Sequence, residues 1–375
     1  MNELEQIIKA YQQCRDSGKS SVLATLVKLQ GSHYRKPGAQ ALIVESGEFV
    51  GNISGGCLET DLLHHAKKAL STGEILLMKY DTSSPEDIVF GLGIGCGGEV
   101  DILLEPVSVN KSHFFLEHVG RLIEQDSSVR SVVIHRSGNK KEVGNRLFLT
   151  EDNRLITDIV SQTTIETIQS LVRKMPVGSN SANQISHTVL GEMEIFSNVI
   201  CPPINLLVIG AGSDALPLIS FAKHLGWRVT VTDHRPAYLT KEKFPDADNL
   251  VQAASENLAN SVNLSKVNAA VILTHNYLRD AKLLKILLPV GLDYLGLLGT
   301  KIRTDNLLKE VELAEVMSIS DARKRLHSPV GLDIGSETPA EIALSIVSEI
   351  QAILSKSAGD VLKSPEIMEL NVARF

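Results

Sequence analysis

The sequence is poor in aromatic residues, in positive charge and in long apolar runs. Only 4% of its 375 residues are Phe, Trp or Tyr, and its formal net charge is −7. Few rings and an acidic balance argue against nucleic acid and against an anionic membrane surface as binding partners. Because no apolar run approaches the roughly 20 residues that span a bilayer, we expect no transmembrane segment either.

Cysteine is also scarce. The four cysteines stand far apart and form no Cys-x-x-Cys pair, which argues against a structural zinc site; they are Cys14, Cys57, Cys96 and Cys201. The first residues have neither the basic start nor the apolar core of a signal peptide. Reduced thiols and the lack of a leader predict a cytoplasmic protein.

What the sequence does contain is glycine beside cysteine. The stretch 51–59 predicts the end of a strand, a turn at Gly55 and Gly56, and a helix with Cys57 in its first turn. Two glycines let the backbone turn tightly and leave its N–H groups free to face a ligand. A thiol at a helix N-terminus lies in positive potential, which favours the thiolate. The alternative is an ordinary strand–helix turn with a small buried cysteine.

A second glycine-rich stretch, 91–98, holds Cys96 between Gly95 and Gly97. Five glycines in eight residues are incompatible with the interior of a stable helix or strand. Such a loop suits close approach of backbone N–H groups to an anion, and the alternative is a flexible surface loop. The turn-rich stretch 31–38 adds the cations Arg35 and Lys36.

The first 200 residues contain a weak internal repeat, with copies at about 19–108 and 127–200. Each copy predicts a strand, a hairpin and a helix, so we expect two copies of one α+β unit packed face to face. The copies differ at the turn, where Val160-Ser161-Gln162-Thr163 stands in place of Ser54-Gly55-Gly56-Cys57. This difference favours a site in the first copy and a scaffold role for the second.

Residues 203–355 predict a Rossmann-type domain with a parallel sheet, after a boundary at the successive prolines 202–203. An apolar strand runs into Gly210-Ala211-Gly212-Ser213-Asp214-Ala215, a helix and a second strand follow, and Asp233 ends that strand. This arrangement is typical of sites for NAD(P) or another nucleotide, with the acid on the ribose hydroxyls. Asp233 could instead be a cap, and Arg235 could meet a phosphate.

We therefore predict an α/β protein in which an N-terminal duplicated α+β domain, 1–200, precedes the Rossmann-type domain. His275 follows a predicted strand at the edge where parallel sheets bind ligands, and is either a site residue or an ordinary loop histidine. The polar tail, 356–375, is expected to pack poorly or to swap into a partner subunit of a homodimer.

Together these motifs resemble the xanthine dehydrogenase accessory proteins, the XdhC/CoxI family, over nearly the whole chain. Members of that family are understood to bind a molybdopterin-type molybdenum cofactor and to support insertion of its sulfurated form into xanthine dehydrogenase or a related molybdenum hydroxylase. Ser213 departs from the histidine of many relatives. The resemblance is carried by Gly31-Ser32, Arg35-Lys36-Pro37-Gly38, Ser54-Gly55-Gly56-Cys57-Leu58-Glu59, 91–99, 210–215, Asp233-His234-Arg235-Pro236 and 327–335.

The resemblance implies a maturation factor that carries cofactor and does no turnover of its own. Its partners would be the client dehydrogenase and a cysteine desulfurase-type sulfur donor. Thiolates at Cys57 and Cys96 suit molybdenum or its sulfur, and Arg35 and Lys36 suit the phosphate of the cofactor. Two other interpretations stay open: an NAD(P)-dependent oxidoreductase, with His275 as its proton-transfer residue, and a stable subunit of the xanthine dehydrogenase complex.

Overall fold

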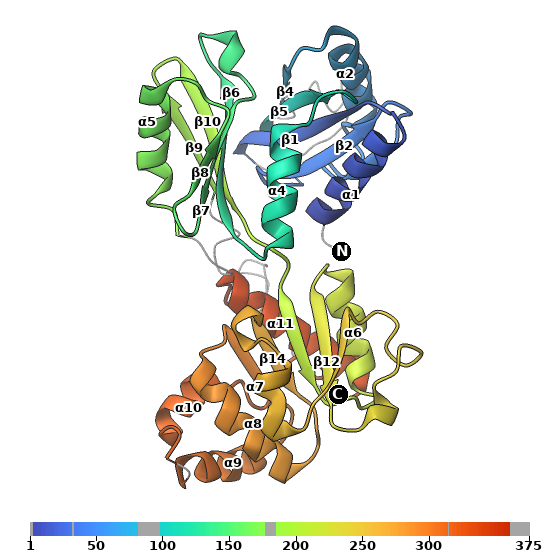
Figure 1. Ribbon diagram of the computed structural model, residues 1–375, viewed down its shortest axis with the longest axis vertical. Coiled ribbons are helices and arrows are strands. Elements are labelled where there is room, and N and C mark those ends of the chain that lie inside the picture. The colour runs from blue at the N-terminus through green and yellow to red at the C-terminus, as the bar shows by residue number, and fades with distance from the viewer. Residues whose placement is uncertain (1–2, 32–33, 82–97, 177–184, 314, 361–375) are drawn as a thin grey trace, which may run out of the picture. The chain divides into compact units, whose positions relative to one another are not determined.

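A computed structural model describes residues 3–31, 34–81, 98–176, 185–313 and 315–360 (Figure 1). The chain divides into two compact units. The N-terminal unit comprises 1–203 with 225–227, and the C-terminal unit comprises 204–224 with 228–375. In the described part of the chain, no helix combines the length and the apolar character needed to cross a bilayer.

The N-terminal unit contains the same run of elements twice. The first run is α1 (Glu3–Asp16), β1 (Ser21–Gly31), β2 (Gln40–Val44), β3 (Phe49–Gly51), α2 (Glu59–Thr72), β4 (Leu76–Asp81) and β5 (Gly98–Val107). The second is α4 (Phe114–Glu124), β6 (Val129–Arg136), η1 (Lys140–Glu142), β7 (Arg146–Thr150), β8 (Leu155–Thr157), α5 (Gln162–Val172), β9 (Ile185–Leu190) and β10 (Met193–Ile200). Neither β4 nor α4 was expected from the sequence.

The two antiparallel sheets of this unit are topological copies. Their strand orders are β3-β2-β1-β5-β4 and β8-β7-β6-β10-β9. Each also has an irregularity at the same place: the pairing of β1 with β5 skips Val27, and the pairing of β6 with β10 skips His135. Shared bulges are features that a fold keeps rather than accidents of one strand. The predicted duplicated α+β architecture is therefore confirmed.

Side chains alternate between the two faces of each strand, so the two faces of a sheet pack against different cores. Side chains of β1 point alternately to the two faces, so Val22 and Ala24 join a core with Leu62 of α2, whereas Leu23 joins a different core. That second core contains residues of α1 and α4 together with residues of both sheets, including Phe148. The helix α4 therefore packs against both copies, between the two sheets in Figure 1.

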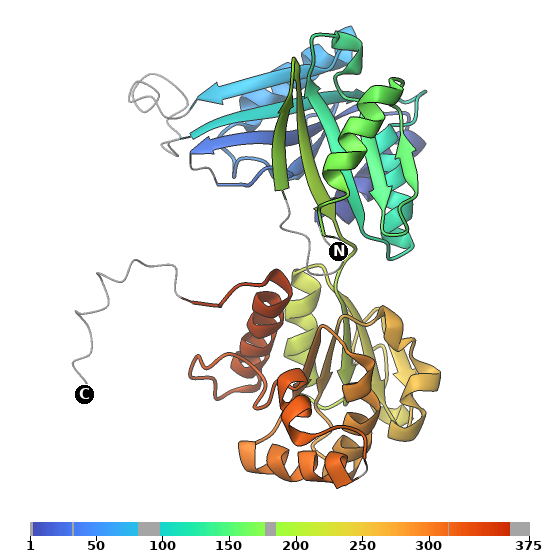
Figure 2. The same cartoon turned by 90° about the vertical axis from the view of Figure 1, so that its left-hand side faces the viewer.

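The C-terminal unit is a five-stranded parallel sheet in the order β13-β12-β11-β14-β15. This confirms the Rossmann-type prediction. Figure 2 shows α11 beside α6 on one side of the sheet. The elements are β11 (Asn205–Ile209), α6 (Ala215–His224), β12 (Arg228–Asp233), η3 (Pro236–Tyr238), β13 (Asn249–Gln252), η4 (Ser255–Asn257), α7 (Leu258–Ser261), η5 (Leu264–Lys266), β14 (Ala269–Ile272), α8 (Tyr277–Leu287), η6 (Leu288–Val290), β15 (Tyr294–Leu297), α9 (Lys301–Leu313), α10 (Ile319–Arg325) and α11 (Pro339–Ser355).

The strand order indicates which edge of this sheet would bind a ligand. Chain order reverses between β11 and β14, and open parallel sheets bind ligands where such a reversal meets the carboxyl ends of the strands. The core beneath is built from the apolar strands and from α8 and α9. α11 begins with a capping box, in which Thr338 accepts from the N–H of Glu341 while the Glu341 carboxylate accepts from the N–H of Thr338.

Candidate functional site

The glycine turn after β11 lies hard against the end of β14. Gly210 has φ +120°, and a Cβ on it would meet the carbonyl oxygen of Leu273 at 2.5 Å, so only glycine fits there. A Cβ on Gly212 would overlap the Asp214 carboxylate. The two glycines thus permit a turn that brings the start of α6 and the end of β14 together.

A cavity of about 340 Å³ opens at this edge of the sheet. It is bounded by the glycine turn, by the ends of β14 and β15, and by the start of α11. Its described lining includes the predicted site residues Gly212, Ser213, Asp214 and His275, whereas Gly210 does not line it. The full lining is Gly212, Ser213, Asp214, Leu273, His275, Leu298, Glu337, Pro339, Ile342, Ala343 and Ile346.

Asp214 and His275 contact each other in the lining of this cavity. His275 Nε2 lies 2.7 Å from Asp214 Oδ2, and the two side chains are 63% and 21% exposed. His275 has φ +53°, a left-handed conformation that costs non-glycine residues about 1–3 kcal/mol. Its neighbours fix the bend: the N–H of Asn276 donates to Thr274 Oγ1, and Asn276 caps α8. The imidazole is therefore held where it orients the carboxylate.

Asp233 and Arg235, both predicted site residues, bind each other and do not line the cavity. The Asp233 side chain is 1% exposed, and it accepts one hydrogen bond from the N–H of Ala211 and three from Arg235. Burial alone would raise the pKa of Asp233, but the hydrogen bonds from Arg235 and Ala211 outweigh it and hold that pKa well below its usual range. This carboxylate fastens the glycine turn to the end of β12.

The turn that carries Cys57 is fixed by Ser54. The Ser54 hydroxyl is buried, donates to Glu59 Oε2 at 2.6 Å and accepts from the N–H of Leu58 at 3.0 Å. Gly55 and Gly56 have φ +78° and +110°. α2 begins only at Glu59, so Cys57 lies ahead of the first helical turn and not within it, contrary to the sequence-based expectation.

The Cys57 thiol is half-buried and donates to the carbonyl oxygen of Ser54 at 3.1 Å. The ring of Tyr34 lies over Gly55, where a Cβ would be 3.0 Å from it. The loop that carries Arg35 and Lys36 therefore runs beside the thiol turn. The Arg35 guanidinium forms an ion pair with Glu3 of α1, and Lys36 is exposed.

The predicted residues Gly95, Cys96 and Gly97 lie outside the described residues, so their proposed role stays a prediction. Within the described ranges, no group of three or more His, Cys, Asp or Glu side chains could hold a metal ion. Cys57 is thus not part of an all-protein metal site among these residues.

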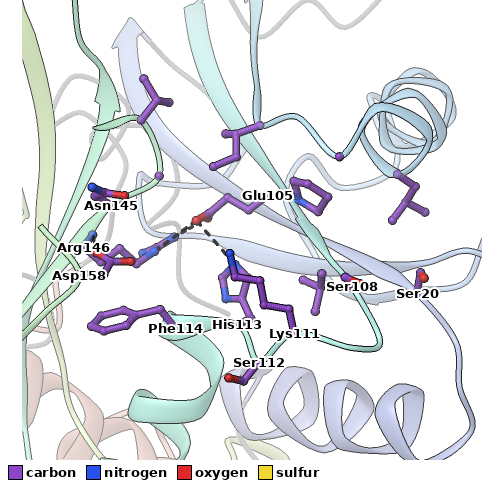
Figure 3. Close-up of a pocket in the computed structure, with 17 residues that line it drawn as sticks. Ser20, Glu105, Ser108, Lys111, Ser112, His113, Phe114, Asn145, Arg146 and Asp158 are labelled. Carbon is purple, nitrogen blue, oxygen red and sulfur yellow. Dashed lines mark hydrogen bonds and ion pairs between the residues drawn. The ribbon is translucent and has the colours of Figure 1, made fainter. Parts of the chain in front are cut away.

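A second cavity, of about 460 Å³, lies between the two copies of the N-terminal unit (Figure 3). Glu105 of β5 stands at its wall between Arg146 of β7 and His113, which precedes α4. Arg146 donates to both Glu105 oxygens, at 2.5 and 3.4 Å, and both side chains are 3% exposed. His113 Nε2 lies 3.7 Å from Glu105 Oε1. A buried ion pair thus joins the copies.

His113 is kept neutral in this place. Burial lowers the pKa of His113 to about 4, although the attraction of Glu105 acts in the opposite direction. Its Nδ1 is buried without a hydrogen-bond partner. None of these three residues was predicted from the sequence. The available signal was a charged residue beside an apolar run in each of two strands, Glu105 after 102–104 and Arg146 before 147–149, which a repeat-based alignment does not distinguish from a surface position.

Two family models match the chain. The XdhC and CoxI family matches residues 14–81, which contain the Cys57 turn, and the XdhC Rossmann domain matches residues 206–350, which contain the cavity of the parallel sheet.

Three similar proteins match over most of their length. A probable xanthine dehydrogenase subunit of Bacillus subtilis (strain 168) is 34% identical over 339 residues, which are 88% of this chain and 92% of that protein. The molybdenum cofactor insertion chaperone PaoD of Escherichia coli (strain K12) is 23% identical over 337 residues, 90% and 84% of the two chains. A crystal structure described as a xanthine dehydrogenase from Bacillus halodurans has a TM-score of 0.76 and 30% identity, covering 97% and 98%. The chain belongs to the XdhC and CoxI family.

Proposed function

We propose that this protein binds the molybdenum cofactor and hands it to a xanthine dehydrogenase or a related molybdenum hydroxylase, without turning over a substrate itself. The names of two relatives support this role, one as a molybdenum cofactor insertion chaperone and one as part of a probable xanthine dehydrogenase. These names apply to the relatives. For this chain, the proposal rests on the chemistry of its own residues.

One juxtaposition carries the proposal: a half-buried thiol at a glycine turn beside a loop with two cations. Cys57 is a soft ligand of the kind that suits molybdenum or its sulfur. The loop beside this turn carries Lys36, which is exposed, and Arg35, which pairs with Glu3, and both cations are suited to the phosphate of the cofactor. When bound, the cofactor would supply a dithiolene-held molybdenum centre, and these residues would hold and orient it. The sulfurated form would be received with the help of a cysteine desulfurase-type donor.

Retention and transfer test the proposal directly. Purified protein is mixed anaerobically with molybdenum cofactor, passed through a desalting column and assayed for molybdenum and for the fluorescence of the oxidised pterin. We expect wild type to retain both and to activate a cofactor-free xanthine dehydrogenase, read as urate formation. Cys57→Ala should retain at least about tenfold less, the loss expected when about 1.4 kcal/mol of binding is removed.

Cys201→Ala is the matched control, because Cys201 is another half-buried thiol of this chain. It should retain cofactor as wild type does. Equal retention by wild type and Cys57→Ala would remove the thiol from the site. Saturable NAD(P)H consumption by the purified protein, with no cofactor transfer, would instead identify an oxidoreductase.

The second candidate function is that of a permanent subunit of xanthine dehydrogenase, and the name of the Bacillus subtilis relative favours it. The two candidates differ in stoichiometry. A carrier leaves its client after transfer, whereas a permanent component co-purifies with the mature enzyme at a fixed ratio, which analytical ultracentrifugation of the reconstituted mixture measures.

A further inference from the structure

The cavity at the edge of the parallel sheet has a carboxylate where a dinucleotide would place its pyrophosphate. In Rossmann domains that group lies on the glycine turn, at the N-terminus of the first helix. Here Asp214 immediately precedes α6, and its carboxylate crowds Gly212. His275 holds the other oxygen at 2.7 Å. The place of an anionic ligand group is therefore taken by an anionic side chain.

The rest of the cavity lining adds negative charge and no fixed positive charge. Glu337 adds a second carboxylate, His275 is the one side chain able to become a cation, and none of the described lining residues is a lysine or arginine. Asp233, which would contact the ribose of a dinucleotide, already accepts four hydrogen bonds from Ala211 and Arg235. Like charges repel at contact distance. A pyrophosphate is disfavoured here, and so is the ribose contact that normally accompanies it.

A carboxylate in a largely aliphatic cavity suits a different ligand. An ionised carboxylate is purely an acceptor, and its two oxygens can accept two parallel N–H groups. The remaining walls are largely aliphatic, with Leu273, Leu298 and Ile346 among them. Aliphatic walls and a double acceptor fit a planar, uncharged ring with two adjacent N–H donors. The aminopyrimidinone edge of a pterin or of guanine has that pattern.

We propose that this cavity binds an aminopyrimidinone ring, with Asp214 accepting its paired N–H groups and His275 positioning Asp214, and that it excludes dinucleotides. The inference rests on the proposed function to the extent that the molybdenum cofactor is the pterin concerned. Its phosphate then lies away from the glycine turn of this unit.

Three probes test the proposal on the full chain: neopterin, guanosine and NADH, each titrated by calorimetry or by ligand fluorescence. Wild type binds neopterin saturably and shows no saturable NADH binding at millimolar concentration. Asp214→Asn keeps the shape but turns one acceptor into a donor, so it weakens neopterin at least about tenfold, or about 1.4 kcal/mol. Asp214→Ala weakens neopterin similarly and admits NADH.

Glu256→Gln is the matched control, because it removes a carboxylate charge from the same unit at an exposed position that does not line the cavity. It keeps the neopterin affinity of wild type. Neopterin affinity that is unchanged in Asp214→Asn, or NADH binding to wild type that is tighter than neopterin binding, overturns the proposal. Guanosine and neopterin have the same aminopyrimidinone edge. Tighter binding of guanosine than of neopterin assigns the cavity to a guanine-containing ligand.

The outcomes separate this proposal from the proposed function. Cofactor retention and transfer that do not change in Asp214→Asn, together with neopterin binding that does not change, reject only the role of Asp214. Neopterin binding that depends on Asp214, in a protein that neither retains nor transfers cofactor, rejects only the carrier function. Circular dichroism and the melting temperature of each variant establish that the loss is not unfolding.

Discussion

The two copies of the N-terminal unit share a topology but differ at the turn before their helix. In the second copy, α5 begins five residues after β8 ends at Thr157, and the Ser161 side chain caps it by accepting from the N–H of Thr164. In the first copy, α2 begins eight residues after β3 ends at Gly51, and its N-cap residue, Leu58, has no side chain that accepts from the first turn. The longer connection holds the two left-handed glycines and Cys57.

This difference separates a turn suited to stability from one that is not. A serine cap is worth about 1 kcal/mol to a helix, and glycines in a connection increase the entropy lost on folding. The first copy gives up the cap and carries the glycines. A departure from local preference without a gain in stability is expected at functional positions. The comparison thus points to the Cys57 turn without any appeal to relatives.

The contacts between the copies show a second difference. Lys28 pairs with Glu194 at 3.0 Å, and Arg136 pairs with Asp101 at 3.6 Å; these four residues occupy equivalent register positions in the two sheets. The buried pair of Glu105 with Arg146 has no such counterpart. The sheet registers align Arg146 with Gln40 and Glu105 with Asn198. The contact between the copies is therefore charged at Glu105 and Arg146 and neutral at their equivalents, Asn198 and Gln40.

Breaking that buried pair should have the largest effect. Arg146→Gln leaves the Glu105 carboxylate buried and unpaired, so we expect the free energy of unfolding to fall by about 3–5 kcal/mol. The double variant Glu105→Asn with Arg146→Gln installs the residues of the neutral side and should recover most of the loss. Urea unfolding of the two variants measures both. A single variant that loses less than about 1 kcal/mol would show that the pair is not a stabilising tie.

His113 should make the same contact sensitive to acid. The unfolded imidazole titrates near 6.5 and the folded one near 4, so the unfolded state binds more protons between these values. The free energy of unfolding then keeps its full value above about pH 6.5 and falls as the pH is lowered toward 4, by up to about 3 kcal/mol. His113→Gln removes this loss. The difference between wild-type and variant unfolding free energies at pH 7 and pH 4.5 measures it, and parallel pH profiles would contradict it.

The helix cap of the second copy should matter less. Ser161→Ala removes the acceptor for the N–H of Thr164 and should cost about 1 kcal/mol, seen as a small fall in the melting temperature. Because the second copy is interpreted as a scaffold, cofactor retention should not change. A retention defect in this variant at equal stability would transfer part of the site to the second copy.

The sequence carried enough information for the architecture and less for the sites. A strand, a glycine turn, a helix and a terminal acid suffice for the Rossmann domain, because short-range signals specify each part. The short apolar run of β4 is compatible with either helix or strand, and α4 joins the copies only through tertiary packing. The pairing of Asp214 with His275 spans 61 residues and arises because β11 and β14 are neighbours in the sheet. No local pattern encodes that neighbourhood.

Asp233 illustrates the limit most clearly. Its position at the end of the second strand predicted a ribose contact, and the glycine turn itself is as expected. What spacing did not reveal is that Arg235, two residues along, folds back to take up both carboxylate oxygens. Ionisable side chains close in sequence can bind each other as readily as a ligand, and only their conformations distinguish the two cases.

The smallest effect on stability should accompany the largest effect on function. Cys57→Thr places in the first copy the residue that the sequence repeat aligns with it, Thr163, although Thr163 lies within α5 and Cys57 precedes α2. The thiol makes one hydrogen bond and is only half-buried, so unfolding free energy should change by less than about 1 kcal/mol. Cofactor retention should nevertheless fall at least about tenfold. The reciprocal Thr163→Cys should gain nothing, because α5 lacks the glycine turn. Retention by Cys57→Thr at the wild-type level would mean that the turn, and not its sulfur, distinguishes the two copies.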